Sequence, residues 1–337
     1  MKDYIRYIDG GLCAISDIEA SGARKGKYGV SVILTKGSTA SGVFTSNKVV
    51  AASVKYTQKV LENAIISAVV ANSGNANCFT GEQGIKDCES LVELVSEKLD
   101  IDKNEIAIAS TGVIGRQMPM DIISEVAIDS ISKLEHSASA SADCAQAIMT
   151  TDTFPKEFAV EITLENGEIV KIGGITKGSG MIAPNMGTML CFLVTDAIIS
   201  AEDINKALKI AVGDSFNMIV VDGDESTNDT ALLMANGQSG VEVVKDGVID
   251  SHFQEGLNYL CIELAKKMAY DGEGATKFME ARVTGALTTE DAKKAVHAVI
   301  SSAYIKVELL TKLRALISTT NTTIMTFLVI ILFSLMI

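Results

Sequence analysis

Apolar positions recur along the chain with two different spacings. Continuous apolar runs of strand length occur at 28–34, 42–45, 65–71, 106–109, 189–194, 218–221 and 241–244, and small polar residues at 37–42 predict a break between the first two. Three- and four-residue spacing predicts helices over 82–99, 120–133, 138–149, 200–213, 252–269 and 289–303. Residues 161–172 alternate around Asn166-Gly167, which predicts a hairpin. This interleaving predicts an α/β fold whose helices cover a sheet.

Composition narrows the class of protein. A chain of 337 residues with 47% hydrophobic content can bury a large core. Its net charge of −13 argues against nucleic acid as a partner, because phosphate binding needs a basic face. The six cysteines form no C-x-x-C pair, and the N-terminus lacks the apolar segment of a signal peptide, which predicts free thiols and a cytoplasmic location.

The unusual chemistry is concentrated between Lys177 and Asp196. Glycines and Pro184 permit sharp turns, and they lead to Thr188 at the start of the apolar run 189–194. Gly187 has no side chain, so the Thr188 hydroxyl could attack the carbonyl before it and cut the chain there. The α-amine released on Thr188, with a pKa near ~7.7–8.0, would then activate the hydroxyl. The alternative is an ordinary threonine on a buried strand after a flexible loop.

Two other motifs resemble ligand-binding sites, but neither predicts one. The pattern Gly178-x-Gly180-x-x-Ala183 resembles a dinucleotide fingerprint, but Pro184 interrupts the helix that must follow. The acidic run 222–229 lacks the glycine and closing glutamate of a calcium loop at the required offsets. The three histidines stand beside no cysteine or carboxylate motif, which argues against a zinc site or a Ser-His triad. We therefore expect neither a metal nor a bound nucleotide cofactor.

Six segments, in order and within about residues 5 to 306, resemble the ornithine acetyltransferase family, also called bifunctional glutamate N-acetyltransferase. They are ANSGNANC (71–78), ASTGVIG (109–115), MTTDT (149–153), the segment 177–196, VDGDESTNDT (221–230) and DGEGATK (271–277). The resemblance implies a layered α/β sandwich of the self-processing N-terminal-nucleophile type. It implies an α subunit, 1–187, and a β subunit, 188–306, associated as a heterotetramer of two α and two β. Family members usually carry alanine where Gly187 stands.

The resemblance also implies site residues and a reaction. Thr188 would take an acetyl group from N-acetylornithine and pass it to glutamate in arginine biosynthesis, while Thr111 and Gly112 form the oxyanion hole. Lys177, Glu273 and Thr188 would bind substrate, together with a threonine that matches either Thr150 or Thr151. Acetyl-CoA as a second acetyl donor stays open. Without the resemblance, Thr111-Gly112 is a strand-ending turn, Lys177 a solvated loop lysine, and Glu273 a turn residue.

The resemblance ends after residue 306. Residues 307–337 form an atypical tail whose last fourteen residues, 324–337, are uncharged and mostly apolar. A membrane span needs about 20 such residues, so we favour a truncated chain with a shifted reading frame over a hydrophobic tail that inserts in a membrane or a partner. Two alternative functions stay open: a related aminopeptidase, in which water replaces glutamate, and an inactive remnant, which a truncated chain would suggest.

Overall fold

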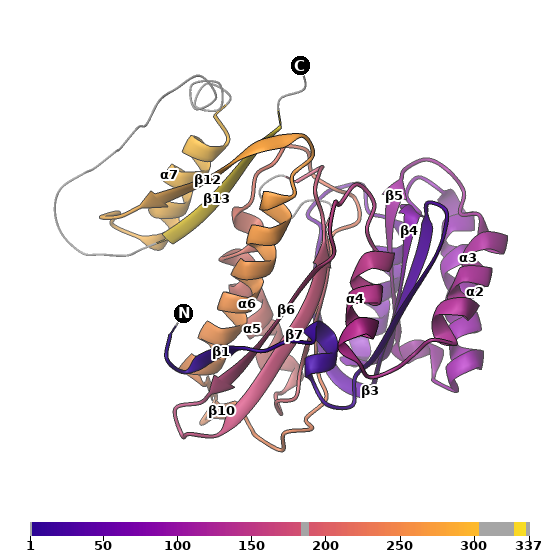
Figure 1. Ribbon diagram of the computed structural model, residues 1–337, viewed down its shortest axis with the longest axis horizontal. Helices are drawn as coiled ribbons and strands as arrows, with labels where there is room; N and C mark the ends of the chain where they lie inside the picture. Colours follow the sequence, from indigo (N-terminus) through magenta and orange to yellow (C-terminus); the bar gives the residue numbers. More distant parts are fainter. Residues whose placement is uncertain (1, 183–188, 303–326, 335–337) are drawn as a thin grey trace.

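The computed structural model describes residues 2–182, 189–302 and 327–334, and within them two layers of strands lie between outer layers of helices (Figure 1). The main sheet has the order β1-β6-β7-β8-β9-β3-β4-β5, and β2 also pairs with β3. Its strands are β1 (Ile5–Tyr7), β2 (Glu19–Lys25), β3 (Tyr28–Phe44), β4 (Ile65–Asn75), β5 (Ile106–Val113), β6 (Lys156–Thr163), β7 (Ile169–Lys177), β8 (Leu190–Thr195) and β9 (Thr230–Ala235).

Strand β3 joins the two strand layers. Its first part, 28–34, pairs with β2 and β4, and its last part, 39–44, pairs with β9. Between them the register shifts, with Gly37 at φ 78°, and the Ser67 hydroxyl accepts the Gly37 N–H at 2.8 Å. The predicted break at 37–42 is therefore wrong, because residues 38–44 pair with β4 or β9 and the irregularity between Leu34 and Ser38 is a bulge that bends one continuous strand.

Helices cover the outer faces of both strand layers. Helices α5 (Ala201–Gly213) and α6 (Ser251–Tyr270) pack on β6 to β9, while α2 (Gly81–Leu99) and α3 (Met120–Ile131) cover β2 to β5. A third core lies between the layers, beside α4 (Ala138–Ala147) and with a contribution from the end of α1 (Ala52–Val60). This layered sandwich confirms the predicted fold class.

The apolar run of β8 is explained by burial on both faces. Cys191 and Leu193 belong to the core under α5 and α6, whereas Leu190, Phe192 and Val194 belong to the core between the layers. A strand buried on both sides reads as a continuous apolar run, without alternation. The predicted helix over 200–213 is α5, and the Ser200 hydroxyl caps it by accepting the Asp203 N–H, as serine commonly does at a helix start.

The predicted strand at 218–221 is wrong. A 3-10 turn, Phe216–Met218, occupies its start, and no strand is assigned to 219–221. Met218 and Val220 pack in one small core while Ile219 and Val221 pack in another, so the apolar run serves two cores and forms a single β-bridge, at Val220, in place of a strand. The actual strand, β9, follows the acidic run and was missed, as were β1 and β2. Of the run 241–244, only Val244 enters a strand, β10 (Val244–Lys245), paired with β11 (Val248–Ile249).

A small lobe extends beyond the end of α6 (Figure 1). It contains β12 (Ala275–Val283), α7 (Thr289–Ile300) and β13 (Phe327–Ser334), and β12 pairs antiparallel with β13. Only 327–334 of the predicted tail, 307–337, falls within the described residues. Across the described part of the chain, no helix is long and apolar enough to cross a membrane.

Close backbone contact holds α4 against β2, which yields a stability test. A Cβ added at Gly22 would lie 2.0 Å from the Asp143 carbonyl oxygen, so Gly22→Ala must displace the α4 backbone. We expect a loss of about 3 kcal/mol in the free energy of unfolding. Gly213→Ala, at the end of α5 with no heavy atom within 4 Å, is the matched control and should be neutral or stabilising. Urea unfolding in a Thr188→Ala background checks this, and equal midpoints for both variants would contradict it.

Candidate active site

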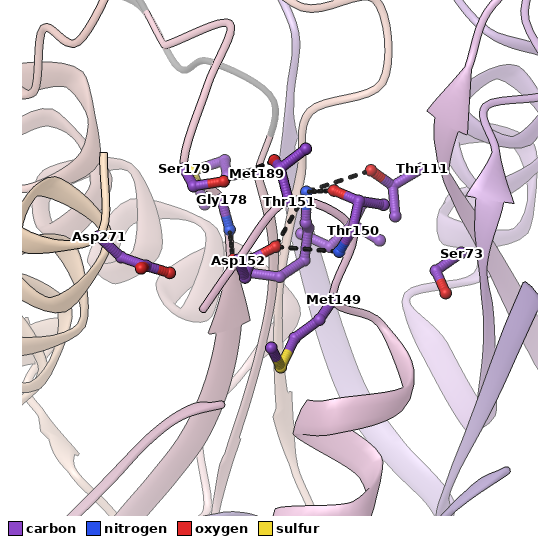
Figure 2. Close-up of polar contacts among 12 residues, drawn as sticks. Ser73, Thr111, Met149, Thr150, Thr151, Asp152, Gly178, Ser179, Met189 and Asp271 are labelled. Carbon is purple, nitrogen blue, oxygen red and sulfur yellow. Dashed lines mark hydrogen bonds and ion pairs between the residues drawn. The ribbon is translucent and has the colours of Figure 1, made fainter. Parts of the chain in front are cut away.

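Three predicted site residues from three separate segments meet at one buried ammonium group. Lys177 ends β7, and its side chain is 1% exposed. Its Nζ donates to the Thr150 hydroxyl at 2.9 Å and to the Thr111 hydroxyl at 3.4 Å (Figure 2). Thr150 follows α4 and Thr111 lies on β5, so the packing of both against β7 creates the site. The reading of Lys177 as a solvated loop lysine is wrong.

Asp152 is the counter-ion of this ammonium, at 3.6 Å from Lys177 Nζ. It also accepts the backbone N–H groups of Gly178 at 2.7 Å and Thr150 at 3.1 Å, as Figure 2 shows, and an ammonium hydrogen bond from Lys156 at 2.7 Å. Burial alone would raise the pKa of Asp152, but Lys177, Lys156 and these hydrogen bonds lower it to about 2. Burial lowers the pKa of Lys177, and Asp152 opposes that shift.

The two adjacent threonines have different neighbours. Thr150 faces Lys177, whereas the Thr151 hydroxyl lies 2.7 Å from the Ser179 hydroxyl. Ser179 also accepts the Glu273 N–H on its carbonyl at 2.7 Å, which brings the turn after α6 to the same loop. A Cβ added at Gly180 would lie 2.7 Å from the Glu273 carboxyl carbon, so the exposed Glu273 side chain rests on a glycine that leaves room for it.

Thr111 and Gly112 do not form the predicted turn, because β5 continues to Val113. Gly112 has φ 132°, and a Cβ there would lie 2.4 Å from the Gly74 carbonyl carbon. Only glycine fits this close approach of β5 to β4. The Asn228 amide donates to the Ser110 carbonyl at 2.8 Å and fixes the residue before Thr111. The candidate oxyanion residues therefore lie on a strand whose backbone is held close to β4.

Gly187 and Thr188 lie outside the described residues, but the residue that follows them is anchored. Met189 donates its N–H to Asp229 Oδ1 at 3.0 Å and accepts the Thr230 N–H on its carbonyl at 3.1 Å.

Asp229 is the most perturbed carboxyl group near the site. Its side chain is fully buried, and Oδ2 has no hydrogen-bond partner among the described residues. Burial raises its pKa to about 8, against the opposing effect of the Met189 N–H, the nearby Ser226 hydroxyl and Lys177. Such shifts are concentrated at functional sites. From the sequence, Asp229 is only part of a weak calcium-loop candidate. A run of acidic residues does not show which of its carboxyl groups is buried.

The other members of the acidic run also interact with protein groups. Asp222 accepts the N–H groups of Met181 and Ile182, which fixes the start of the segment leading to Thr188. Within the ranges that the structure describes, no group of three or more His, Cys, Asp or Glu side chains could hold a metal. A cavity of about 790 Å³ lies elsewhere, between α2 and α3, and none of the site residues line it.

The layered sandwich, with a buried lysine and threonine hydroxyls beside the start of a central strand, defines an enzyme of the N-terminal-nucleophile fold. The ArgJ family model matches residues 16–312. A protein from Methanothermobacter thermautotrophicus named glutamate N-acetyltransferase is 52% identical over 90% of this chain and 73% of its own length. One of the same name from Methanosarcina acetivorans is 49% identical over 90% and 75%.

A solved structure agrees with these matches. The arginine biosynthesis bifunctional protein argJ of Bacillus halodurans is 30% identical, with a TM-score of 0.50, and its chain is covered in full by 56% of this one. This chain therefore belongs to the ArgJ family of acyltransferases, and the family inferred from the six sequence segments is confirmed.

The raised pKa of Asp229 yields a test of stability against pH. Its folded-state pKa, about 8, lies above the usual value near ~4. Asp229 therefore contributes fully to the free energy of unfolding below pH ~4. This contribution is lost as the pH rises to about 8, because in that window its carboxyl ionises only in the unfolded state. Asp229→Asn cannot ionise, so its stability relative to wild type should rise by a few kcal/mol between pH 5 and 8. Urea unfolding at several pH values, with both chains in the Thr188→Ala background, measures this.

The exposed Asp224→Asn is the control for that experiment. A surface substitution usually changes stability by less than about 0.5 kcal/mol, so its difference from wild type should stay small at every pH. A pH-independent difference for Asp229→Asn would contradict the assigned pKa.

Proposed function

We propose that this chain transfers an acetyl group from N-acetylornithine to glutamate through an acetyl-Thr188 intermediate, after cutting itself between Gly187 and Thr188. The observation that carries the proposal is the convergence of Thr111, Thr150 and the buried Lys177 beside the anchored Met189. The relatives named glutamate N-acetyltransferase, about 50% identical over 90% of the chain, support the choice of reaction.

Cleavage begins when the Thr188 hydroxyl attacks the Gly187 carbonyl carbon. The C–N bond breaks, the hydroxyl proton passes to the departing nitrogen, and the resulting ester is hydrolysed by water. The new α-amine then acts as the base. Cleavage would divide this chain into 1–187 and the segment from 188 onward. The first part would contain 187 of the 337 residues.

In the transfer reaction, the Thr188 oxygen attacks the acetyl carbonyl carbon of N-acetylornithine, and the α-amine passes the hydroxyl proton to the leaving amine of ornithine. The amine of glutamate then attacks the ester, and its proton returns to the threonine oxygen. Each attack creates an oxyanion that needs donors. The Thr111 hydroxyl accepts from Lys177 and so can turn its own hydrogen to the oxyanion, and the Gly112 N–H supplies a second donor.

Substrate binding uses the charges of the site. Lys177 and Thr150 bind a carboxylate, since an ammonium and a hydroxyl converge there. Glu273, exposed and held at the same loop through Ser179, binds the cationic amine of ornithine. Thr150 is the substrate threonine, because Thr151 is paired with Ser179 instead. The reaction requires no bound cofactor, and acetyl-CoA enters at most as an alternative acetyl donor.

The two fragments are expected to stay associated. Strand β8, in the second fragment, hydrogen-bonds to β7 of the first over Leu190–Thr195. Strand β9, also in the second, pairs with β3 over six residue pairs. These contacts support tight α–β association, while the heterotetramer and the cytoplasmic location stay predictions.

Self-cleavage can be checked directly on the purified chain. We expect two fragments on a denaturing gel, with Edman sequencing of the smaller one starting at Thr-Met-Leu. Thr188→Ala should run as one intact chain, whereas Thr188→Ser should still be cut. An active wild-type enzyme that stays in one piece would contradict this mechanism.

Acetyl transfer provides the second test. The wild-type chain should form N-acetylglutamate from N-acetylornithine and glutamate, and Thr188→Ala should lose the activity entirely, because the motif contains no other nucleophile. Release of ornithine should depend on glutamate. Turnover at the same rate without glutamate would indicate hydrolysis, as in an aminopeptidase, and normal transfer by Thr188→Ala would refute the intermediate. Supplying acetyl-CoA in place of N-acetylornithine tests the second donor separately.

A further inference from the structure

A second buried lysine, Lys156, pairs with the same carboxylate as Lys177 and has no role in the proposed reaction. It begins β6, and its side chain is 0% exposed. Its ammonium donates to Asp152 Oδ1 at 2.7 Å, to Asp271 Oδ2 at 2.6 Å and to the Phe154 carbonyl at 3.4 Å. A buried ammonium is costly unless it is paired, and this one is fully paired.

Asp152 is shared unequally between the two lysines. Lys156 lies 2.7 Å from Oδ1, which also accepts the Gly178 N–H at 2.7 Å, whereas Lys177 lies 3.6 Å from Oδ2. Lys156 therefore makes the closer ion pair with this carboxylate. Lys177 is left with a loose ion pair, and its ammonium is oriented toward the hydroxyls of Thr150 and Thr111 instead.

Asp271 extends the cluster to the opposite side of the site. It follows α6 and accepts both the N–H of Thr153, at 2.9 Å, and the Thr153 hydroxyl. Two residues later comes Glu273. Through Asp152 and Asp271, Lys156 connects the loop that carries Thr150 to the turn that carries Glu273. One ammonium therefore helps to hold both the segment that binds the substrate carboxylate and the segment that binds the substrate amine.

We propose that Lys156 is a positioning residue for the transfer reaction: by occupying Asp152, it keeps the Lys177 ammonium available to the substrate carboxylate. This inference rests on the proposed function for the identity of the substrate. Without Lys156, Asp152 has only one cation left, and Lys177 closes on it. The ammonium then turns away from Thr150, and the substrate carboxylate loses its partner.

The test separates charge balance from positioning. Lys156→Met removes the charge with a side chain of similar length, and leaves two buried carboxylates, of which Asp152 keeps Lys177 as its partner and Asp271 loses its ion pair. The double variant Lys156→Met/Asp271→Asn removes one charge of each sign and restores neutrality. We therefore expect the single variant to lose thermal stability and the double variant to regain most of it.

The double variant should regain stability but not substrate affinity. In both variants, KM for N-acetylornithine and for glutamate should rise at least about tenfold, as expected for a lost charge-assisted hydrogen bond, while kcat changes much less. Asp271→Asn alone, which keeps Lys156 on Asp152, is the matched control and should raise KM by a smaller factor. A double variant with restored stability and wild-type KM would overturn the proposal, because it would make the role of Lys156 structural.

A crystal structure of the double variant gives a readout that does not depend on activity. The distance from Lys177 Nζ to Asp152 should shorten from 3.6 Å to a direct hydrogen bond of about 2.8 Å. An unchanged distance would also overturn the proposal. Failure of the wild-type chain to transfer acetyl groups would instead count against the proposed function, and this distance would still decide the role of Lys156.

Discussion

The site depends on the burial of one carboxylate, Asp152, between two ammonium groups. Removing charges from water costs several kcal/mol for each ion, and only close pairing with further hydrogen bonds recovers it. Asp152 meets this requirement by also accepting backbone N–H groups from Gly178 and Thr150. Because those donors lie directly after β7 and in the loop after α4, hydrogen bonding to the carboxylate fixes both segments together. Removing one partner of such a pair typically costs 3–5 kcal/mol, which makes this arrangement hard to deform.

Much of the fold could be predicted from the sequence, since its signals are local. The periodicity of 82–99, the cap at Ser200 and the Asn166-Gly167 turn each report a preference that the folded chain keeps. The failures come from tertiary packing. The small residues around Gly37 read as a loop because a bulge is recognisable only when the partner strand is known. The apolar run 218–221 reads as a strand, yet its residues are divided between two cores.

Some residues of the site could be predicted from the sequence and others could not. Thr111, Thr150 and Lys177 stand in segments whose sequences resemble a known family, and the structure brings them within hydrogen-bond distance. Lys156 carries no such signal. It is one charged residue at the start of a strand, and its meaning depends on Asp271, which lies 115 residues further along the chain. Asp229 stood in a motif that the sequence did reveal, but its fully buried carboxyl could not be distinguished there from its exposed acidic neighbours.

The position of β8 within the sheet has a consequence for reversibility. This strand pairs with β7 on one side and with β9 on the other, so a cut before Thr188 leaves β8 hydrogen-bonded in place while removing its covalent connection to β7. Assembly of the sheet is then unimolecular before the cut and bimolecular after it. A processed molecule that unfolds must find its other half by diffusion, at a rate that depends on protein concentration. Its lifetime would be governed by the barrier to strand separation, and dilution would make every complete unfolding event effectively permanent.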